Sequence, residues 1–306
     1  MNSAVMLVDI GGTNTRIAYL RSGRIGRVSR HPTKSLANAA ATLRKIAADD
    51  GYRVAGVAMA AAGPVAGNRV RLTNVDVSVD ARTVRRALRA KWAVLVNDMT
   101  ATARAVPELR PVDLRTLHTG RGDPDAVRVV VAPGTGLGIG AVKRVHGKWC
   151  VIDGEGGHAA GPGANHIGTG RTGADQTNTS WEDLLSGPGL LRMYRRGGGR
   201  ARSASEITTR AARGEARAKK VIARWCELLG RCCADMVLIF GARGGCYVAG
   251  GMVPSLGKQF DRAAFRTGYK THRKFESYLR AVPVRQVIRP EPVLVGLRAL
   301  VQDRGA

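Results

Sequence analysis

The sequence predicts an α/β fold with two lobes, and three observations support this prediction. The chain has 306 residues, of which 44% are hydrophobic, so it can bury a sizeable core in two lobes or in one large domain. Two apolar segments near the N-terminus are joined by a glycine turn, and helices and strands alternate after them. The same pattern of strand, glycine turn and strand returns at residues 127–142. We interpret this repetition as the result of an ancient duplication.

The first cycle opens with two strands, expected at residues 5–8 and 17–20, around a turn of glycine and small hydroxyl residues. A helix is expected at 35–48, where apolar residues recur at helical spacing. The sequence also predicts a short strand near 24–28, strands at 54–60 and 70–72, a helix at 80–90 with Asp80 as its N-cap, a strand at 92–96 and a helix at 100–106.

The second cycle repeats this beginning, with strands at 127–131 and 137–142 around a turn at 133–136. Residues 154–173 are rich in glycine and irregular, and a loop of that length in a compact domain is usually functional or mobile. The remaining elements expected are helices at 180–196, 205–213, 214–238 and 254–266, strands at 245–249 and 284–288, and a final helix at 293–302.

The chain is strongly basic, with a formal net charge of +26 carried mostly by arginine. Such a charge attracts nucleic acid or other polyanions. The arginines are spread over several helical stretches, however, and aromatic residues make up only 5%, which disfavours a base-stacking surface. We therefore do not expect nucleic acid as a partner. A diffuse solvated surface and the electrostatic steering of an anionic substrate remain as alternatives.

Cysteine usage and hydropathy indicate a cytoplasmic protein without a membrane span. The five cysteines are an odd number, and none forms the C-x-x-C spacing of a zinc site, so reduced thiols are expected. The longest apolar run, at 127–142, is interrupted by Arg128, Pro133 and glycines. The N-terminus does not show the pattern of a secretory signal.

The turn after the first strand has the composition of an anion-binding loop. Gly11 and Gly12 allow the backbone to approach a bulky anion and to direct N–H groups at it. Thr13 and Asn14 add side-chain donors, and the carboxylate of Asp9 can hold a hydrated Mg²⁺. A plain glycine-rich hairpin is the alternative. The segment is neither a P-loop nor a dinucleotide-binding fingerprint.

Seven motifs, in order along nearly the whole chain, resemble the bacterial glucokinases of the non-zinc type, which belong to the superfamily of actin, hexokinase and sugar kinases. The motifs are Asp-Ile-Gly-Gly-Thr-Asn-x-Arg at 9–16, Leu-Thr-Asn at 72–74, Val-Asn-Asp-Met-Thr-Ala at 96–101, Gly-Thr-Gly-Leu-Gly at 134–138, Gly-Glu-Gly-Gly-His at 154–158, Leu-Ser-Gly-Pro-Gly-Leu at 185–190 and Val-Ala-Gly-Gly-Met-Val-Pro at 248–254. The segment after His158 has no cysteine, which disfavours the zinc-binding branch.

The resemblance implies a ribonuclease H-like (actin/hexokinase-like) fold with a cleft for ATP and sugar between two α/β lobes. The small lobe would comprise residues 1–108, joined by a C-terminal helix at 289–306, and the large lobe residues 109–288. The implied reaction transfers the γ-phosphoryl group of Mg-ATP to the 6-hydroxyl of D-glucose and gives glucose 6-phosphate, the first step of glycolysis. The resemblance is also compatible with a homodimer.

Individual roles follow from the matched motifs. Asp98 matches the catalytic base, and the sugar ligands match Asn97, Glu155, His158 and Glu182. The residues implied in binding ATP are Asp9 with its water-bound Mg²⁺, Gly11, Gly12, Thr13 and Asn14 on the β/γ-phosphate side, Gly134, Thr135 and Gly136 on the phosphate tail, and Gly250 and Gly251 at the adenosine. Without the resemblance, the same residues also suit helix caps, turns and a surface histidine.

Two departures from the family pattern leave the substrates open. Residues 159–179 are shorter, richer in glycine and more basic than the family's segment, and the family's Trp after Thr-Asn is missing at 74–78. The alternatives are therefore a kinase for mannose, fructose or an amino sugar, and a glucokinase that uses polyphosphate. A further alternative of another class is a non-catalytic regulator that binds sugar or nucleic acid.

Overall fold

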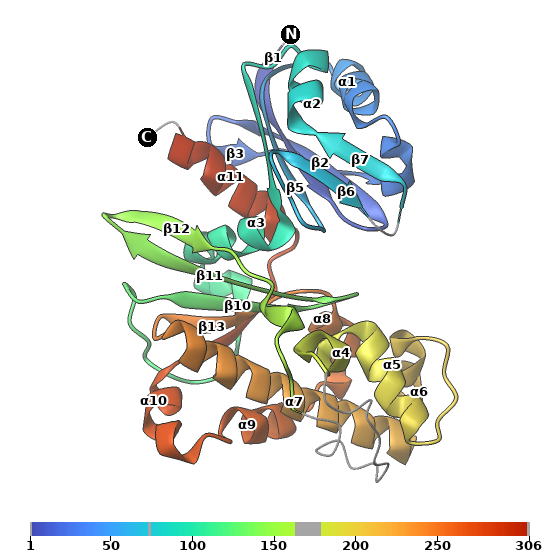
Figure 1. The fold of residues 1–306 in the computed structure, drawn as a ribbon, viewed down its shortest axis with the longest axis vertical. Coiled ribbons are helices and arrows are strands. Elements are labelled where there is room, and N and C mark those ends of the chain that lie inside the picture. The colour runs from blue at the N-terminus through green and yellow to red at the C-terminus, as the bar shows by residue number, and fades with distance from the viewer. Residues whose placement is uncertain (1, 73–74, 163–178, 305–306) are drawn as a thin grey trace. The chain divides into compact units, whose positions relative to one another are not determined.

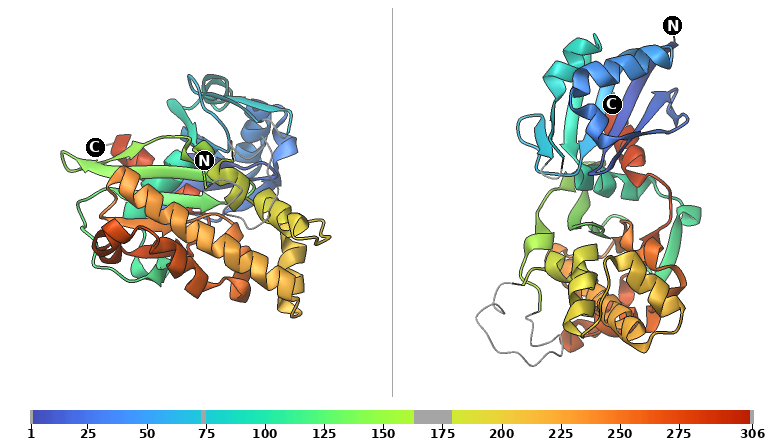
Figure 2. Two further views of the ribbon diagram at one scale, coloured as in Figure 1. Left: turned by 60° about the horizontal axis from the view of Figure 1, so that its bottom comes forward. Right: turned by 90° about the vertical axis from the view of Figure 1, so that its right-hand side faces the viewer.

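The computed structural model describes residues 2–72, 75–162 and 179–304, which form two compact units (Figures 1 and 2). Unit 1 comprises Met1–Leu109 and Pro290–Ala306, and unit 2 comprises Arg110–Arg289. The lobe boundaries expected from the sequence lie one residue away from these divisions. Thr73, Asn74 and most of the 159–179 segment lie outside the described residues.

Unit 1 is built on a mixed sheet with the strand order β3-β2-β1-β5-β8, and β4 also pairs with β2. Its first hairpin is antiparallel, whereas β5 runs parallel to β1 and β8 runs parallel to β5. The strands are β1 (Asn2–Ile10), β2 (Asn14–Arg21), β3 (Arg24–Ile25), β4 (Ser29–Pro32), β5 (Tyr52–Ala61) and β8 (Trp92–Asn97). A separate antiparallel pair is formed by β6 (Arg69–Leu72) and β7 (Val77–Asp80).

Helices cover both faces of this sheet (Figure 1). Because successive strand residues face opposite sides, Met6 and Val8 of β1 belong to one core cluster and Leu7 to another. The first cluster includes side chains of α1 (Ala39–Asp49) and α2 (Ala81–Ala87). The second includes side chains of α3 (Asp98–Ala105) and α11 (Pro292–Arg304). The C-terminal helix is thus part of the core of unit 1.

The contact between α3 and α11 is close and carries buried charge. A Cβ at Gly296 of α11 would collide with the carbonyl oxygen of Ala101 in α3. The buried guanidinium of Arg104 donates to Asp303 at 2.8 Å from Nε and at 3.0 Å from Nη2, and to Glu108 at 3.0 Å. These two features fix the packing of the helix that begins at Asp98.

Unit 2 repeats the sheet of unit 1. Its strand order is β12-β11-β10-β13-β14-β9, with β10 and β11 forming an antiparallel hairpin and β13 and β14 running parallel to β10. The strands are β9 (Leu114–His118), β10 (Arg128–Pro133), β11 (Leu137–Val145), β12 (Lys148–Ile152), β13 (Gly245–Val248) and β14 (Val284–Val287). The order and direction of five strands agree between the two units, as the repeated hairpin pattern predicts.

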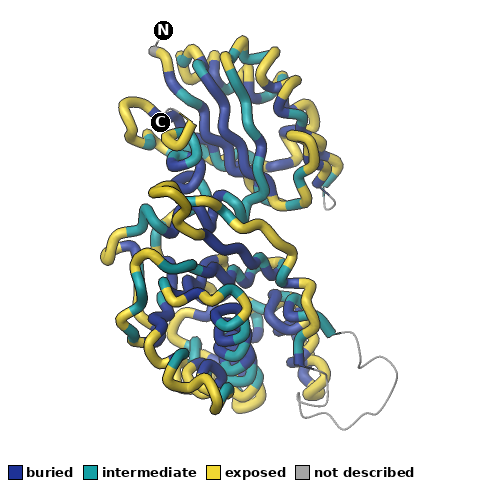
Figure 3. Tube along the Cα trace, turned by 60° about the vertical axis from the view of Figure 1, so that its left-hand side comes forward, coloured by how far each residue is buried: buried dark blue, intermediate teal, exposed yellow. Residues whose placement is uncertain are grey.

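The helices of unit 2 pack around α7 (Ala216–Phe240), whose apolar face includes the fully buried Trp225. In Figure 3 this buried interior is dark blue and the connecting loops are largely exposed. The other helices are α4 (Trp181–Leu185), α5 (Gly187–Arg196), α6 (Ala204–Ala212), α8 (Met252–Leu256), α9 (Arg262–Tyr269) and α10 (Glu276–Ala281).

Several predicted elements differ from those observed. The helix expected at 180–196 is interrupted at Ser186, whose hydroxyl accepts from the N–H of Gly189 and caps α5. The helix expected at 254–266 is divided after Leu256, because Gly257 takes a left-handed φ of +53°. Asp80 caps α2, as predicted. Among the described residues, the strands not expected from the sequence are β4, β7, β9 and β12.

Two further sequence observations have structural counterparts. All five cysteines lie in the described part of the chain and none is paired; Cys150 is exposed and the other four are buried. Within the described residues, no helix has the length and apolar character needed to cross a membrane.

The packing of α11 on α3 predicts that Gly296→Ala destabilises the protein. The added methyl group meets a backbone carbonyl, so the helices must move apart, and overpacking of this kind costs about 1–3 kcal/mol. Urea unfolding of G296A against the wild type measures this loss. Gly154→Ala is the control, because its Cβ would meet no atom within 4 Å. Equal unfolding midpoints for G296A and the wild type would contradict the close contact.

Candidate functional site

The candidate residues of unit 1 lie at one edge of its sheet. Ile10 of β1 is paired with Ala61 of β5, and Ala61 is paired with Asn97 of β8. The three parallel strands therefore end level with one another. The glycine turn follows β1, and the Asn97–Asp98 pair spans the end of β8 and the start of α3, so both lie at these carboxyl ends, where α/β sheets usually bind their ligands.

The glycine turn is held in shape by Thr33 of η1 (Thr33–Leu36). The Thr33 hydroxyl donates to the carbonyl oxygen of Gly11 at 2.7 Å, and the Thr33 N–H donates to that of Thr13 at 2.9 Å. Gly12, Thr13 and Asn14 are exposed. Since two carbonyl groups of the turn are occupied by Thr33, the turn presents a fixed backbone to solvent, as an anion-binding loop requires.

Asp9 is a buried carboxylate with a cross-strand partner. Arg16 is directly opposite Asp9 in the hairpin and donates to its Oδ2 at 2.9 Å. Burial raises the pKa of Asp9 above its ordinary value, and the neighbouring Arg16 guanidinium partly opposes that rise. Nε of Arg16 also lies 4.0 Å from Glu291, which receives a hydrogen bond from Arg30 at 2.6 Å.

The donor set at Asp9 fits a cation held through water rather than a complete protein cage. Among the described residues, no group of three His, Cys, Asp or Glu side chains could hold a metal ion. Mg²⁺ commonly keeps several waters and uses one or two carboxylates together with substrate phosphates. Asp9, with one oxygen bonded to Arg16, is compatible with that mode of binding.

Asn97 is the N-cap of α3. Its Oδ1 accepts from the N–H of Met99 at 2.8 Å, and its Nδ2 donates to the carbonyl of Gly63 at 2.9 Å. Each side-chain atom keeps capacity for one more hydrogen bond. Asp98 is the first residue of α3, where the partial positive charge of the helix terminus favours a carboxylate. The capping and functional interpretations of this pair are therefore compatible.

The candidate residues of unit 2 gather around the backbone of Leu137, the first residue of β11. The Leu137 N–H donates to Oε2 of Glu182 at 2.8 Å. Gly136 leaves room for this carboxylate, since a Cβ there would lie 2.5 Å from Oε2. The N–H of Gly187 donates to the carbonyl of Gly134 at 2.8 Å. The turn at 134–136 is thus held by α4 and by the first residue of α5.

Glu155 and His158 are held close to the same strand. Glu155 precedes the short turn η4 (Gly156–His158) and His158 is its last residue, and the N–H of His158 donates to the carbonyl of Glu155 at 2.9 Å. A Cβ at Gly157 would collide with the carbonyl oxygen of Leu137, so the turn can pack here only because this residue is glycine. Both side chains are exposed, which leaves them available to a ligand.

Gly250 and Gly251 follow β13, and Gly250 lies beside Pro133, the last residue of β10 before the turn of the same hairpin. Gly250 has a left-handed φ of +76°, and a Cβ there would collide with the carbonyl of Pro133. Both glycines are exposed, and nothing lies within 4 Å of a Cβ at Gly251. A ligand can therefore approach the backbone of Gly251 closely.

The predicted site residues thus form one group in each unit. Sequence reasoning assigned no role to Arg16, Thr33 or Gly187, although Arg16 and Gly187 lie inside recognised motifs. The spacing could have revealed Arg16, because a hairpin whose last pair is Ile10 and Thr15 places residue 16 opposite residue 9. No local signal connects Thr33 with the turn.

A family model described as Glucokinase matches residues 6–304. The chain belongs to the glucokinase family. The sequence-based predictions of this family and of the actin/hexokinase-like fold class are confirmed.

Individual proteins with similar sequences or structures bear names consistent with this family. The chain is 36% identical to the glucokinase of Chromobacterium violaceum over 97% of its own length and 89% of that protein. It is 33% identical to the bifunctional protein glk of Paraburkholderia xenovorans over 98% of its own length, and it spans about half (49%) of that relative. A crystal structure of glucokinase from an Antarctic psychrotroph has the same fold, with a TM-score of 0.82, 24% identity and coverage of 98% and 99% of the two chains.

The raised pKa of Asp9 predicts how stability depends on pH. The folded state binds the Asp9 proton more tightly than the unfolded chain does, so this contribution to stability is present at low pH and is lost as pH rises through the folded pKa. Asp9→Asn does not titrate. We therefore expect the unfolding free energy of the wild type, minus that of D9N, to fall as pH rises above about 4.

Urea unfolding of both proteins between pH 4 and 8 measures this difference. Asp125→Asn serves as the control, because Asp125 is an exposed surface carboxylate of unit 2. A wild-type advantage over D9N that grows with pH would show that Arg16 outweighs burial.

Proposed function

We propose that the chain transfers the γ-phosphoryl group of ATP to the 6-hydroxyl of D-glucose, giving ADP and glucose 6-phosphate. The observation that carries this proposal is the level ending of β1, β5 and β8. It brings an exposed anion-binding turn and the Asp98 carboxylate to the same sheet edge. Phosphoryl transfer depends mainly on positioning and charge neutralisation, and this edge supplies groups for both.

Asp98 is proposed as the general base. As the glucose 6-hydroxyl oxygen bonds to the γ-phosphorus, its proton passes to the Asp98 carboxylate, and the bond from the γ-phosphorus to the β,γ-bridging oxygen breaks. Asp98 is in the first turn of α3, next to the N-cap Asn97. Asn97, next to it, retains hydrogen-bonding capacity for a sugar hydroxyl.

Glu155, His158 and Glu182 are proposed as the sugar-binding residues of unit 2. Carboxylates accept hydrogen bonds from the hydroxyl groups that glucose presents, and an imidazole donates or accepts one. Glu155 and His158 are exposed, and Glu182 uses Oε2 for Leu137, so its Oε1 is the oxygen assigned to sugar.

The two glycine hairpins are proposed to bind ATP. Gly11, Gly12, Thr13 and Asn14 are assigned to the β- and γ-phosphates, and the turn at 134–136 with Gly250 and Gly251 is assigned to the remainder of the nucleotide. Asp9 would hold a hydrated Mg²⁺, which neutralises charge on the phosphates when bound. This assignment is supported by the exposure of the turns and by the donor set at Asp9.

The proposal extends to the setting of the enzyme. A cytoplasmic location is supported by the five unpaired cysteines. We retain the homodimer as part of the proposal, and sedimentation of the purified chain decides it. We also propose that units 1 and 2 are the two lobes of the kinase, each contributing its own group of site residues.

The proposed role of Asp98 predicts that Asp98→Asn loses turnover while still binding sugar. Removing a general base costs about 10²–10⁴-fold in rate. A coupled assay of ADP release with Mg-ATP and a panel of glucose, mannose, fructose and glucosamine measures turnover. The panel is repeated with polyphosphate in place of ATP, with formation of the sugar phosphate as the readout, and calorimetry measures glucose binding. Asp125→Asn is the matched control, since it removes one exposed carboxylate elsewhere.

Glucose-dependent ADP release that D98N abolishes and D125N retains supports the proposal. A better hexose in the panel would replace glucose as the acceptor, and turnover only with polyphosphate would replace ATP as the donor. If no sugar is phosphorylated with ATP or with polyphosphate, the kinase proposal is wrong, and a regulator that binds sugar is favoured.

A further inference from the structure

An arginine-lined pocket lies in unit 2, and none of its residues has a role in the proposed reaction. The pocket has a volume of about 720 Å³ and is formed where the end of α5, the loop at 197–203 and α6 meet. Its charged lining consists of four arginines and one glutamate: Arg195, Arg200, Arg202, Arg210 and Glu206. A volume of this size is typical of a small-molecule site.

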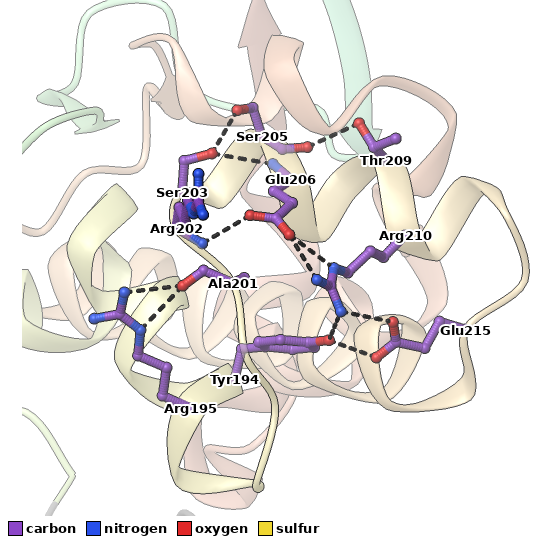
Figure 4. Close-up of polar contacts among 10 residues, drawn as sticks. All are labelled: Tyr194, Arg195, Ala201, Arg202, Ser203, Ser205, Glu206, Thr209, Arg210 and Glu215. Carbon is purple, nitrogen blue, oxygen red and sulfur yellow. Dashed lines mark hydrogen bonds and ion pairs between the residues drawn. The ribbon is translucent and has the colours of Figure 1, made fainter.

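Two of the arginines are fixed by the protein, as Figure 4 shows. Nε and Nη2 of Arg195 donate to the carbonyl oxygen of Ala201 at 3.1 and 2.9 Å. Nε and Nη2 of Arg210 donate to Oε1 of Glu206 at 3.1 and 2.6 Å. A fixed guanidinium loses less conformational entropy when it binds a ligand, so these contacts prepare the pocket for an anion.

The one carboxylate in the lining is already satisfied. Oε1 of Glu206 accepts both bonds from Arg210, and Oε2 accepts from the backbone N–H of Arg202 at 2.7 Å. These hydrogen bonds, led by that from Arg202, lower the pKa of Glu206 and keep it ionised. Arg210 is shared between two carboxylates, because its Nη1 also lies 3.6 Å from Oε2 of Glu215, so the four arginines set against Glu206 and Glu215 leave an excess of two positive charges.

The loop that carries the remaining arginines is shaped by Tyr194. A Cβ at Gly199 would collide with the buried ring of Tyr194, so the loop lies directly on that ring. The Tyr194 hydroxyl donates to Glu215 at 2.6 Å and accepts from Arg210 at 3.3 Å. The side chains of Arg200 and Arg202 are exposed and have no hydrogen-bond partner within the described part of the chain.

We propose that this pocket binds the phosphate group of a small molecule, with the exposed Arg200 and Arg202 as its ligands beside the fixed Arg195. The guanidinium fork matches the geometry of phosphate oxygens, and the excess positive charge suits a phosphate dianion. Such a group could come from a sugar phosphate, the product class of the proposed reaction, or from inorganic phosphate. The proposal does not depend on the kinase function, because its test compares variants that alter this pocket and leave the proposed active-site residues unchanged.

The test compares two double variants of equal net charge. R200A/R202A removes two pocket arginines that make no side-chain hydrogen bond in the described structure, so we expect it to fold. R196A/R213A removes two exposed arginines at the ends of the same helices, α5 and α6, outside the pocket lining. Calorimetric titration of the full chain with glucose 6-phosphate, and separately with inorganic phosphate, measures the Kd for each protein.

The expected result is a rise in Kd of at least about tenfold in R200A/R202A and little change in R196A/R213A. If R200A/R202A loses affinity for glucose 6-phosphate and the wild type binds inorganic phosphate only weakly, the ligand is a sugar phosphate. If R200A/R202A loses affinity for inorganic phosphate alone, the ligand is inorganic phosphate. Equal affinities in the wild type and R200A/R202A, an equal loss in both double variants, or no binding of either compound would overturn the proposal.

Discussion

The backbone of Leu137 is the point on which the candidate site of unit 2 depends. Its N–H donates to Glu182, and its carbonyl oxygen lies so close to Gly157 that no side chain fits there. These contacts join the glycine hairpin to the turn bearing Glu155 and His158, and to the helix bearing Glu182. The Leu137 N–H needs an acceptor, which Glu182 supplies. The Leu137 carbonyl oxygen occupies the space that a side chain at position 157 would need, so that residue must be glycine. One peptide segment thus positions both the residues proposed to contact phosphate and those proposed to contact sugar.

In unit 1, different residues hold the glycine turn of the first hairpin. Its sheet has the same strand order and directions, and its first hairpin also ends in a glycine turn. There the turn is held by Thr33, which bonds to two turn carbonyls, instead of by a carboxylate and the N–H of Gly187. The repeated topology therefore fixes where the glycine turn lies in each unit, while local side chains determine which hydrogen bonds hold the backbone of that turn. In unit 1 the parallel register also places Asp98 at the same edge as the turn.

The sequence was informative where short-range patterns determine structure. The hairpins, the Asp80 cap and the long helix α7 follow from apolar periodicity and capping chemistry, and the ordered motifs identified the family. The contact between Glu182 and Leu137 could not be predicted, because it joins residues 45 positions apart that no local signal relates. The division of a predicted helix at Ser186 was missed although Ser186 followed by Pro188 is a helix-start signal that could have been found. The Asp9–Arg16 pair follows from hairpin register and could have been found.

The most direct test of this account is steady-state kinetics of Glu182→Ala and Glu182→Gln with glucose and ATP varied separately. Glutamine keeps an oxygen that can accept from Leu137, so E182Q should preserve the hairpin and raise only the KM for glucose. Alanine removes both functions, so E182A should raise the KM for glucose and for ATP, each by about tenfold or more. An ATP KM that E182A leaves unchanged would contradict the claim that Glu182 holds the phosphate-binding turn.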